Sequence, residues 1–284
     1  MLKRVPSPGL PRSHHHLERI RKKLGNPEVS SRFETEHESV RVRNLNRYGP
    51  GGWTTGRSYG KYRDFFDDGL AKTRMGTDFL GFIAGVPHDG RFIVHEYGPG
   101  QGEALERIGR ELRVRGLPAS TRAIDSFPHR DLVERHKRGA INDLSIERAE
   151  LFRPEEQAHA VIDVLGPMNY VIPELRRDYF LKTAHSLAPG GVMLVGFNEA
   201  LLSRPEDSPA YRRGVVGGLF GRRRMWSALF PGAQFEGDVR LAEWALKRAG
   251  FEARFFRYGK PGERHGWDFP ERGLILRRPV KEKS

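Results

Sequence analysis

Short apolar runs alternate with segments of helical periodicity along residues 92–197. The runs are FIVHEY from residue 92, STRAID from 120, AVIDVLG from 160 and GGVMLVGF from 190. Between the first two, Leu105, Ile108 and Leu112 fall at i, i+3 and i+7, which places them on one face of a helix. Buried strands that alternate with helices are typical of parallel sheets built from crossover connections. The pattern therefore predicts an α/β fold with a mostly parallel sheet and helices on both of its faces.

The rest of the C-terminal half continues this pattern with one interruption. A helix is predicted from Pro173 to about residue 187, because a proline is harmless in a helix's first turn. The polar and basic segment 198–237 breaks the alternation and is interpreted as an insertion. A further helix is predicted to end at Gly250, and the strand candidates FEARFFRYG and RGLILRR follow it.

The N-terminal part looks different. Residues 1–47 are charged, contain several prolines and show little apolar periodicity, which favours a flexible or loosely docked arm without core residues. Residues 48–62 interleave glycines with four aromatic residues. Two interpretations stand for that stretch: a loop that folds over a ligand, or a surface loop whose aromatics pack on the core. We therefore predict a basic arm at 1–47 and one domain at 48–284.

Composition limits the location and the chemistry. Hydrophobic residues make up 37% of the chain, and no apolar run approaches the roughly 18 to 20 residues that a bilayer requires, so we expect no membrane span. Cysteine is absent, which excludes disulfides, thiolate ligands and cysteine nucleophiles and fits a reducing compartment such as the cytoplasm. The adjacent histidines 14–16 lack the spacing of a designed site, and no metal site is predicted.

The net charge of +13 is concentrated in three segments. Residues 1–48 hold 11 basic and 5 acidic residues, residues 201–224 hold 6 and 2, and residues 276–284 hold 4 and 1. The rest of the chain is neutral. Basic extensions can attract nucleic acid or an anionic surface, although solvated basic tails are also common.

The segment HEYGPGQG at residues 95–102 lies between a predicted strand and a predicted helix. Glycines in such a turn let the backbone approach a ligand and aim helix N-terminal amides at it. The dinucleotide fingerprint G-x-G-x-x-G would need a glycine where this chain has Glu103, which disfavours a nicotinamide oxidoreductase. An acid, Glu96, instead stands two residues before G-x-G-x-G.

The sequence E-x-G-x-G-x-G resembles the first motif of the class I S-adenosylmethionine-dependent methyltransferases. The resemblance extends over residues 92–278 and includes the segment LAPGG before the fifth strand and the closing helix and two strands. It implies a Rossmann-like methyltransferase sheet with an antiparallel C-terminal strand, and S-adenosyl-L-methionine as the cofactor. The implied contacts of its methionine part are Glu96, Tyr97, Gly98, Pro99, Gly100 and Gly102.

Further cofactor contacts are implied beyond the glycine turn. Asp125 ends the second strand, and an acid about 20 residues beyond such a turn can accept hydrogen bonds from ribose hydroxyls. By itself the same residue could equally cap a helix. Ser126 follows it, as in many members of the family. Near the adenine the family often has Asp-Ala, whereas this chain has Arg148 and Ala149, so the adenine contact stays open.

The loop after the fourth strand lies beside the sulfonium and the acceptor in the family. Asp163 and Leu165 occupy this place and are implied cofactor contacts. If the acceptor must lose a proton, the candidate bases are Asp163, His185 and Tyr170, in that order. A structural acid, a surface histidine and a packing aromatic are the alternatives.

The sequence thus predicts a methyltransferase whose acceptor pocket is closed by residues 48–62 and 198–237. The alternatives are an RNA methyltransferase and a catalytically silent nucleic-acid-binding protein on the same fold. Without cysteine, the covalent mechanism of cytosine-C5 methylation is excluded. We favour a small-molecule acceptor over RNA, because the part of the chain outside the basic segments is neutral. The oligomeric state is not predicted.

Overall fold

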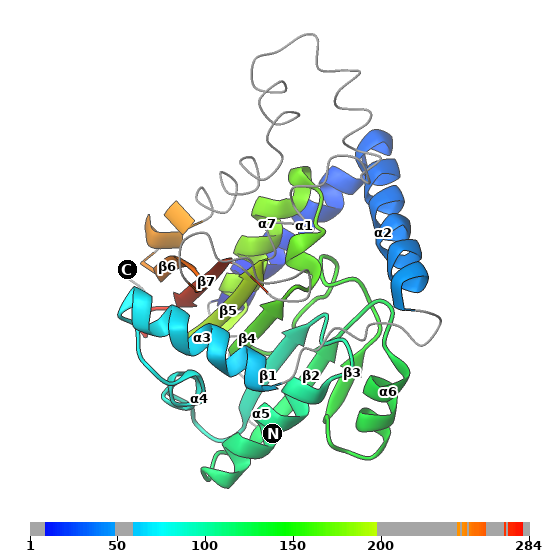
Figure 1. Cartoon of the computed structure of the whole chain (residues 1–284). Coiled ribbons are helices and arrows are strands. Elements are labelled where there is room, and N and C mark those ends of the chain that lie inside the picture. The colour runs from blue at the N-terminus through cyan, green and yellow to red at the C-terminus, as the bar shows by residue number, and fades with distance from the viewer. Residues whose placement is uncertain are drawn as a thin grey trace, which may run out of the picture.

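The computed structural model describes residues 9–48, 59–197, 243–244, 246–248, 250–259, 270 and 272–280. Within them a seven-stranded sheet has the order β3-β2-β1-β4-β5-β7-β6 (Figure 1). Its strands are β1 Phe92–Tyr97, β2 Ala119–Ile124, β3 Asp143–Ser145, β4 Ala158–Val164, β5 Leu187–Phe197, β6 Glu252–Arg257 and β7 Arg272–Arg277. The expected insertion at 198–237 lies outside the described residues.

The pairing of the strands confirms the expected fold class. Strands β1 to β5 pair in parallel, whereas β7 runs antiparallel to both of its neighbours, β5 and β6. The order reverses between β1 and β4, so the loops after these two strands leave the same edge of the sheet in opposite directions. A crevice for a ligand is expected at that point.

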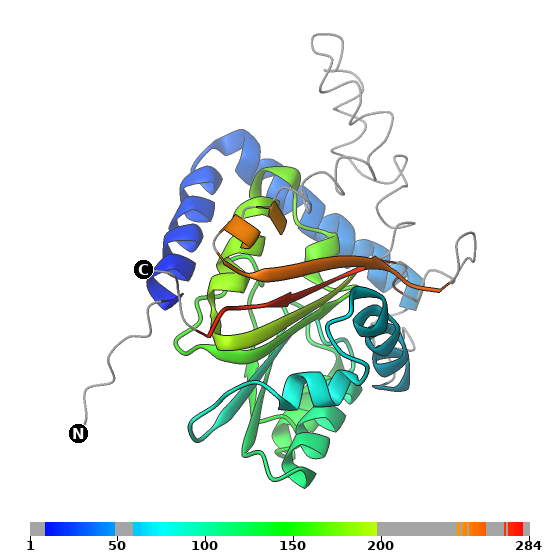
Figure 2. The ribbon, with the colours of Figure 1, turned by 90° about the vertical axis from the view of Figure 1, so that its left-hand side faces the viewer.

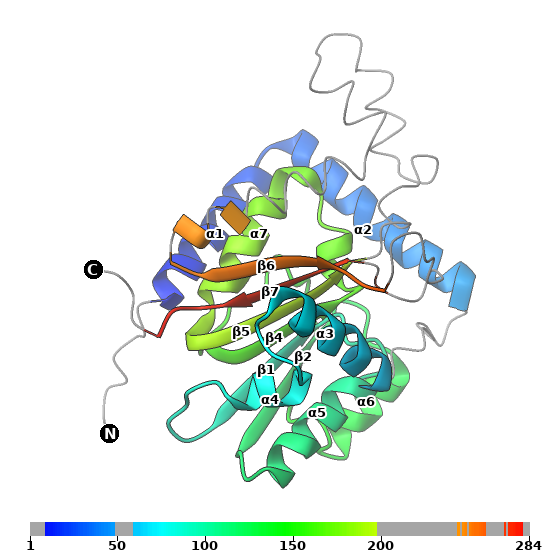
Figure 3. The ribbon, with the colours of Figure 1, turned by 60° about the vertical axis from the view of Figure 1, so that its left-hand side comes forward.

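Helices cover both faces of the sheet (Figures 2 and 3). Helices α1 and α7 pack on one face and helices α3, α4 and α5 on the other. The bounds are α1 Gly9–Leu24, α2 Pro27–Tyr48, α3 Tyr59–Thr73, α4 Phe79–Ala84, α5 Glu103–Val114, α6 Arg130–Lys137, the 3-10 turn η1 Pro167–Asn169 and α7 Pro173–His185. None of the described helices combines the length and apolarity that crossing a membrane would require.

Strand β1 shows why its sequence predicted a central strand. Alternate side chains point to opposite faces of a sheet. Accordingly Phe92 and Val94 belong to the cluster under α3 to α5, whereas Ile93 and Tyr97 belong to the cluster under α7. Both faces are covered, so all six residues of the strand are buried.

The N-terminal residues correct one expectation. We expected residues 1–47 to contribute nothing to the core, but Leu17 and Ile20 are fully buried and Phe33 is 4% exposed. Leu17 and Ile20 lie three residues apart on α1, on a face that packs along α7. The placement of a domain boundary at residue 47 stays a prediction.

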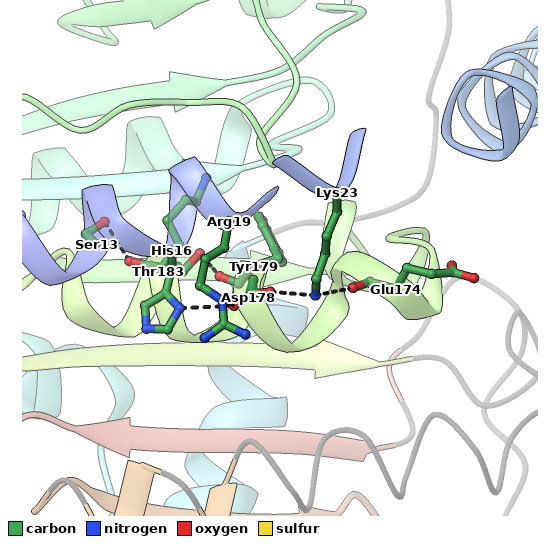
Figure 4. A network of polar contacts seen from close by, with 9 residues as sticks. Ser13, His16, Arg19, Lys23, Glu174, Asp178, Tyr179 and Thr183 are labelled. Atoms are coloured by element: carbon green, nitrogen blue, oxygen red, sulfur yellow. Dashed lines mark hydrogen bonds and ion pairs between the residues drawn. The ribbon is translucent and has the colours of Figure 1, made fainter. Parts of the chain in front are cut away.

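Polar contacts also hold α1 on α7 (Figure 4). The Asp178 carboxylate, 1% exposed, accepts from His16 Nδ1 at 3.1 Å and lies 3.2 Å from Arg19 Nε and 2.6 Å from Lys23 Nζ. The buried Ser13 hydroxyl donates to the Lys182 carbonyl oxygen at 2.8 Å. Asp178 of α7 thus contacts three side chains of α1, two of them cations and one a histidine.

Candidate functional site

A cavity opens at the carboxyl ends of β1, β2 and β4, where the strand order reverses. Its volume is about 80 Å³ for the centre of a water-sized sphere, and the space between its lining atoms is about 720 Å³ when open solvent is included. All four of the expected regions contribute to it: the glycine turn, the loop after β2, the turn that contains Ala149 and the loop after β4. The lining residues are Phe33, Glu36, His37, Gly98, Gly100, Ile124, Asp125, Ser126, Phe127, Ala149, Glu150, Leu165, Gly166, Pro167, Tyr170 and Ile172. The position is the one expected for a ligand in an open α/β sheet.

The glycine turn has the backbone that its sequence requires. Gly98, Gly100 and Gly102 have φ values of 64°, 60° and 78°, in the left-handed region that favours glycine. Gly102 is the N-cap of α5, and Gly98 lies against the loop after β4, where an added Cβ would come within 2.9 Å of the Pro167 ring. The turn therefore brings two loops of the cavity into direct backbone contact.

Glu96 and Tyr97 lie behind this turn and do not line the cavity. Glu96 is fully buried, and its Oε1 accepts a hydrogen bond of 2.8 Å from the Tyr62 hydroxyl of α3. Tyr97 points to the opposite face, where its ring centroid lies 6.2 Å from that of Tyr179. Of the expected aromatic stretch 48–62, residues 48 and 59–62 are described: Tyr48 ends α2, and Tyr59 begins α3, where Tyr59 and Tyr62 are buried.

Asp125 and Ser126 stand at the end of β2 and line the cavity. Asp125 is 9% exposed, and its Oδ1 accepts a 2.8 Å hydrogen bond from the backbone N–H of Phe127. This contact fixes the turn, and a carboxylate can accept several hydrogen bonds. Ser126 Oγ lies 3.2 Å from His37 Nε2 of α2.

The turn at Arg148 and Ala149, which was expected near the adenine, lies only partly at the cavity. Ala149 is 3% exposed and lines the cavity, as does Glu150, whose pKa is raised by burial. Arg148 does not line it: the guanidinium stacks 4.0 Å above the Phe33 ring and bonds to Glu34 at 2.9 and 3.0 Å. Arg148 therefore connects α2 to this turn.

Lys182 of α7 organises the same turn and was missed from the sequence. Its ammonium nitrogen donates to the carbonyl oxygens of Ala149, Glu150 and Phe152, the last two at 3.1 Å. The side chain is 1% exposed, and burial lowers its pKa to about 7. A lysine inside the largely apolar stretch Tyr179–Ala184 was the available signal, because buried lysines require partners.

Asp163 does not line the cavity but bonds to η1, which follows the lining residue Gly166 and begins with the lining residue Pro167. Its carboxylate is fully buried, and Oδ2 accepts from the Met168 backbone N–H and from the Tyr179 hydroxyl, both at 3.1 Å. Burial, followed by the Asp163 charge, raises the pKa of Tyr179. Leu165, with φ of 52°, and Tyr170 do line the cavity. Of the three candidate bases, only Tyr170 thus borders the cavity.

His185, the second of the candidate bases, lies away from the cavity. It is the last residue of α7, whose first turn begins beside the cavity at Ile172. At about 1.5 Å per residue a helix of this length carries its far end roughly 20 Å away. There the His185 ring packs between those of His16 and Phe251, with centroids 5.7 and 5.4 Å away.

His37 is a cavity residue that the sequence did not reveal. It lies on α2, within the segment expected to be an arm, and its ring centroid is 4.6 Å from that of Phe127. Burial, followed by the charge of Arg148, lowers the pKa of His37 to about 4. The imidazole is therefore neutral at pH 7, with one nitrogen able to donate and the other to accept.

His95 of β1 is a further buried histidine with a measurable consequence. It is fully buried, and among the described residues neither ring nitrogen has a hydrogen-bond partner. Its ring meets the Phe152 ring edge-on at 5.8 Å. Burial lowers the pKa of His95 from 6.5 to about 3, so the folded protein keeps this ring neutral where the unfolded chain would protonate it.

The folded protein should therefore lose stability as the pH falls from about 6.5 toward about 3. His95 alone contributes up to about 1.4 kcal/mol per pH unit in that window. We expect His95→Leu to reduce the slope of unfolding free energy against pH by about that amount between pH 6 and 4. Urea denaturation at several pH values measures it, and an unchanged slope would show that His95 binds protons equally in both states.

Comparisons with known proteins come from structure alone. No protein-family model matches the chain, and no curated protein matches its sequence. Among solved structures, N-methyltransferase NodS from Bradyrhizobium japonicum in complex with S-adenosyl-L-homocysteine has 16% identity and a TM-score of 0.47, covering 86% of this chain and 99% of that one. An S-adenosylmethionine-dependent methyltransferase from Clostridium acetobutylicum has 9% identity and a TM-score of 0.46, covering 86% and 98%.

A third similar structure is the 1,6-didemethyltoxoflavin-N1-methyltransferase of Burkholderia thailandensis, with 12% identity, a TM-score of 0.44 and coverage of 86% and 90%. Identities this low concern the fold only. The fold class itself follows from this chain's own strand order, with its reversal beside β1 and its antiparallel β7.

Proposed function

We propose that this protein is an S-adenosylmethionine-dependent methyltransferase. The observation that carries the proposal is the cavity at the strand-order reversal, with the motif E-x-G-x-G-x-G on one side of it and Asp125 on the next strand. Gly98 and Gly100, which have positive φ values, carry no side chain and so leave the backbone bare where the turn meets the cavity. This combination supports a ligand that has both an amino-acid part and a ribose.

The residues in the cavity suit different parts of that cofactor. Gly98 and Gly100 would contact the methionine part, and Asp125 would accept hydrogen bonds from the ribose hydroxyls. Ala149 and Leu165 would contact the base and the region near the sulfonium. The bound cofactor would supply an electrophilic methyl group on a positively charged sulfur.

The protein's own residues would then contribute to catalysis mainly by positioning the acceptor against the cofactor. Methyl transfer is an in-line displacement, which accelerates when the acceptor atom is held about 3 Å from the methyl carbon and water is excluded. Tyr170 is the candidate base that borders the cavity, and we assign it to the acceptor side. Asp163 would act indirectly by fixing η1 through Met168 and Tyr179.

We further propose an acceptor that is a small molecule without phosphate groups. Among the described residues, the cavity lining includes the acids Glu36, Asp125 and Glu150 but no lysine or arginine. Phosphate recognition ordinarily uses such cations, so this lining disfavours a nucleic-acid backbone in the cavity. A screen of acceptor pools with radiolabelled cofactor identifies the class: labelling of amines or hydroxyl compounds supports the proposal, and exclusive labelling of RNA contradicts it.

Asp125→Asn tests the cofactor assignment. The asparagine Oδ1 can still accept from the Phe127 N–H and keep the turn, but the charge that would bind the ribose is lost. We expect S-adenosylhomocysteine affinity to fall by roughly 1.5 to 3 kcal/mol in calorimetry, the scale of hydrogen bonds to charged groups. Melting without ligand should change little.

Asp131→Asn, an exposed acid at the start of α6, serves as the control and should bind normally. Unchanged affinity in Asp125→Asn would contradict the ribose role. Failure of the native protein to bind S-adenosylhomocysteine would contradict the proposed function itself.

A further inference from the structure

One face of α2 forms a wall of the cavity. Phe33, Glu36 and His37 all line it, and they fall at i, i+3 and i+4, so a single helix turn presents them together. The remaining lining comes from the loops after the strands and from residues around η1. The N-terminal segment, which has no part in the motifs singled out in the sequence, thus completes the cavity.

The position of this wall is fixed by contacts with the core. Arg32 forms an ion pair with Glu174 of α7, and Glu34 bonds to Arg148 with two hydrogen bonds. The preceding helix α1 is in turn tied to α7 through Asp178 (Figure 4). These contacts flank the turn that bears Phe33, Glu36 and His37, and they hold its side chains at the cavity.

His37 faces one particular part of the cavity. Its Nε2 lies 3.2 Å from Ser126 Oγ, and its ring lies 4.6 Å from the Phe127 ring. Ser126 and Phe127 directly follow Asp125, the residue assigned to the ribose. His37 therefore borders the end of the cavity where a nucleoside would lie, while the glycine turn borders the other end.

The chemistry of His37 suits an uncharged heteroaromatic group. An imidazole that is neutral at pH 7 offers one donor and one acceptor, and its flat ring can pack against another ring. A cationic side chain here would favour phosphate, whereas a neutral one favours the base or sugar of a nucleoside without phosphates. The neighbouring Phe127 extends the flat surface.

We propose that His37 of α2 is a binding residue for the nucleoside part of the cofactor, so that the N-terminal helices belong to the cofactor site. The inference rests on the proposed function and adds to it a residue outside the methyltransferase motifs. Its direct consequence is that removing the His37 ring weakens binding of the nucleoside part, whether or not the methionine part is present.

Two ligands separate the two ends of the cavity. S-Adenosylhomocysteine carries both the nucleoside and the amino-acid part, whereas 5′-methylthioadenosine carries the nucleoside alone. Calorimetric titration of full-length native protein, His37→Ala and His37→Gln with each ligand measures the contribution of the ring. We expect His37→Ala to bind both ligands about ten-fold more weakly, the scale of one lost hydrogen bond with its packing, and His37→Gln to recover part of the loss.

Glu38→Gln provides the matched control. Glu38 is the next residue of α2, its side chain is 54% exposed, and it bonds to Arg41 on its own helix. This variant should bind both ligands as the native protein does. The melting temperature of each variant without ligand shows whether α2 has stayed in place.

Three results would overturn the inference. The first is equal affinity of His37→Ala and the native protein for both ligands, and the second is an equal loss in Glu38→Gln, which would indicate displacement of the helix. The third is loss of S-adenosylhomocysteine binding with normal 5′-methylthioadenosine binding, which would place His37 at the amino-acid end. All three leave the proposed function intact, because the native protein binds S-adenosylhomocysteine in each; failure of that binding would contradict both.

Discussion

Gly100→Val is expected to weaken S-adenosylhomocysteine binding by about 100-fold or more in calorimetry, while the protein remains folded. Gly100 has a φ of 60° and lines the cavity. A β-branched residue there costs roughly 1 to 2 kcal/mol in backbone strain and also places a side chain at the cavity wall. The strain changes the turn, and the side chain competes with the ligand for the space that glycine leaves open.

Gly139→Val separates these two effects. Gly139 has a similar φ of 76°, nothing lies within 4 Å of its added Cβ, and it does not line the cavity. This variant should lose a comparable amount of intrinsic stability and bind S-adenosylhomocysteine normally. Unchanged affinity in Gly100→Val, or an equal loss in both variants, would remove the glycine turn from the cofactor site.

Asp178→Asn is expected to lower the free energy of unfolding by about 3 kcal/mol at pH 7. The reason is that Arg19 and Lys23 of α1 lose the buried negative charge with which they pair. The carboxylate is 1% exposed, whereas Arg19 and Lys23 are 46% and 36% exposed and can still turn to water. The loss should therefore lie at the low end for a buried ion pair. Urea denaturation of the full chain measures it.

The effect has a defined pH dependence. Burial by itself would raise the pKa of Asp178, but hydrogen bonds from His16 and Lys23 and the charges of Lys23 and Arg19 outweigh it and lower the pKa from 3.8 to about 2. A lowered carboxyl pKa stabilises the fold above the unfolded value and ceases to do so as the pH falls through the folded one. The difference between native and Asp178→Asn should therefore be full above about pH 4 and decrease toward pH 2.

Glu18→Gln is the control on the same helix. Glu18 pairs with Arg21 at 2.6 Å, but its side chain is 64% exposed. Exposed pairs contribute about 0 to 1 kcal/mol, so this variant should be nearly as stable as the native protein. A change in Asp178→Asn no larger than that of Glu18→Gln would show that α1 is held by its apolar contacts alone.

Local pattern was sufficient for six of the seven described strands and for the glycine turn, whereas the three-residue strand β3 was not predicted. A strand buried on both faces, such as β4, reads as a continuous apolar run because each of its faces meets a layer of helices. The turn at Gly98 to Gly102 was visible because a left-handed backbone restricts the choice of residue. Asp125 was found by its distance along the chain from that turn, since the ends of neighbouring parallel strands meet at one edge.

The N-terminal helices were missed although a signal was present. Leu17, Ile20 and Leu24 fall at i, i+3 and i+7, the spacing that predicted α5 correctly. Many charged residues surround these three apolar residues, so the segment was interpreted as a solvated arm despite the helical spacing. From neighbouring residues alone, Arg19 and Lys23 are expected to point into solvent. In the structure both pair with Asp178, which is more than 150 residues away in the sequence.

The sequence by itself determined the strands β1, β2 and β4 to β7, the helices α5 and α7, the position of the glycine turn and the acid that follows it, because each depends on local backbone preferences and on periodicity. Only the tertiary structure decided which side chains reach the cavity. It brought in His37 from a segment that had looked peripheral, placed Lys182 beside the turn at Ala149, and packed the His185 ring between those of His16 and Phe251. Such placements depend on how helices pack on a sheet, and packing joins residues whose separation along the chain carries no local signal.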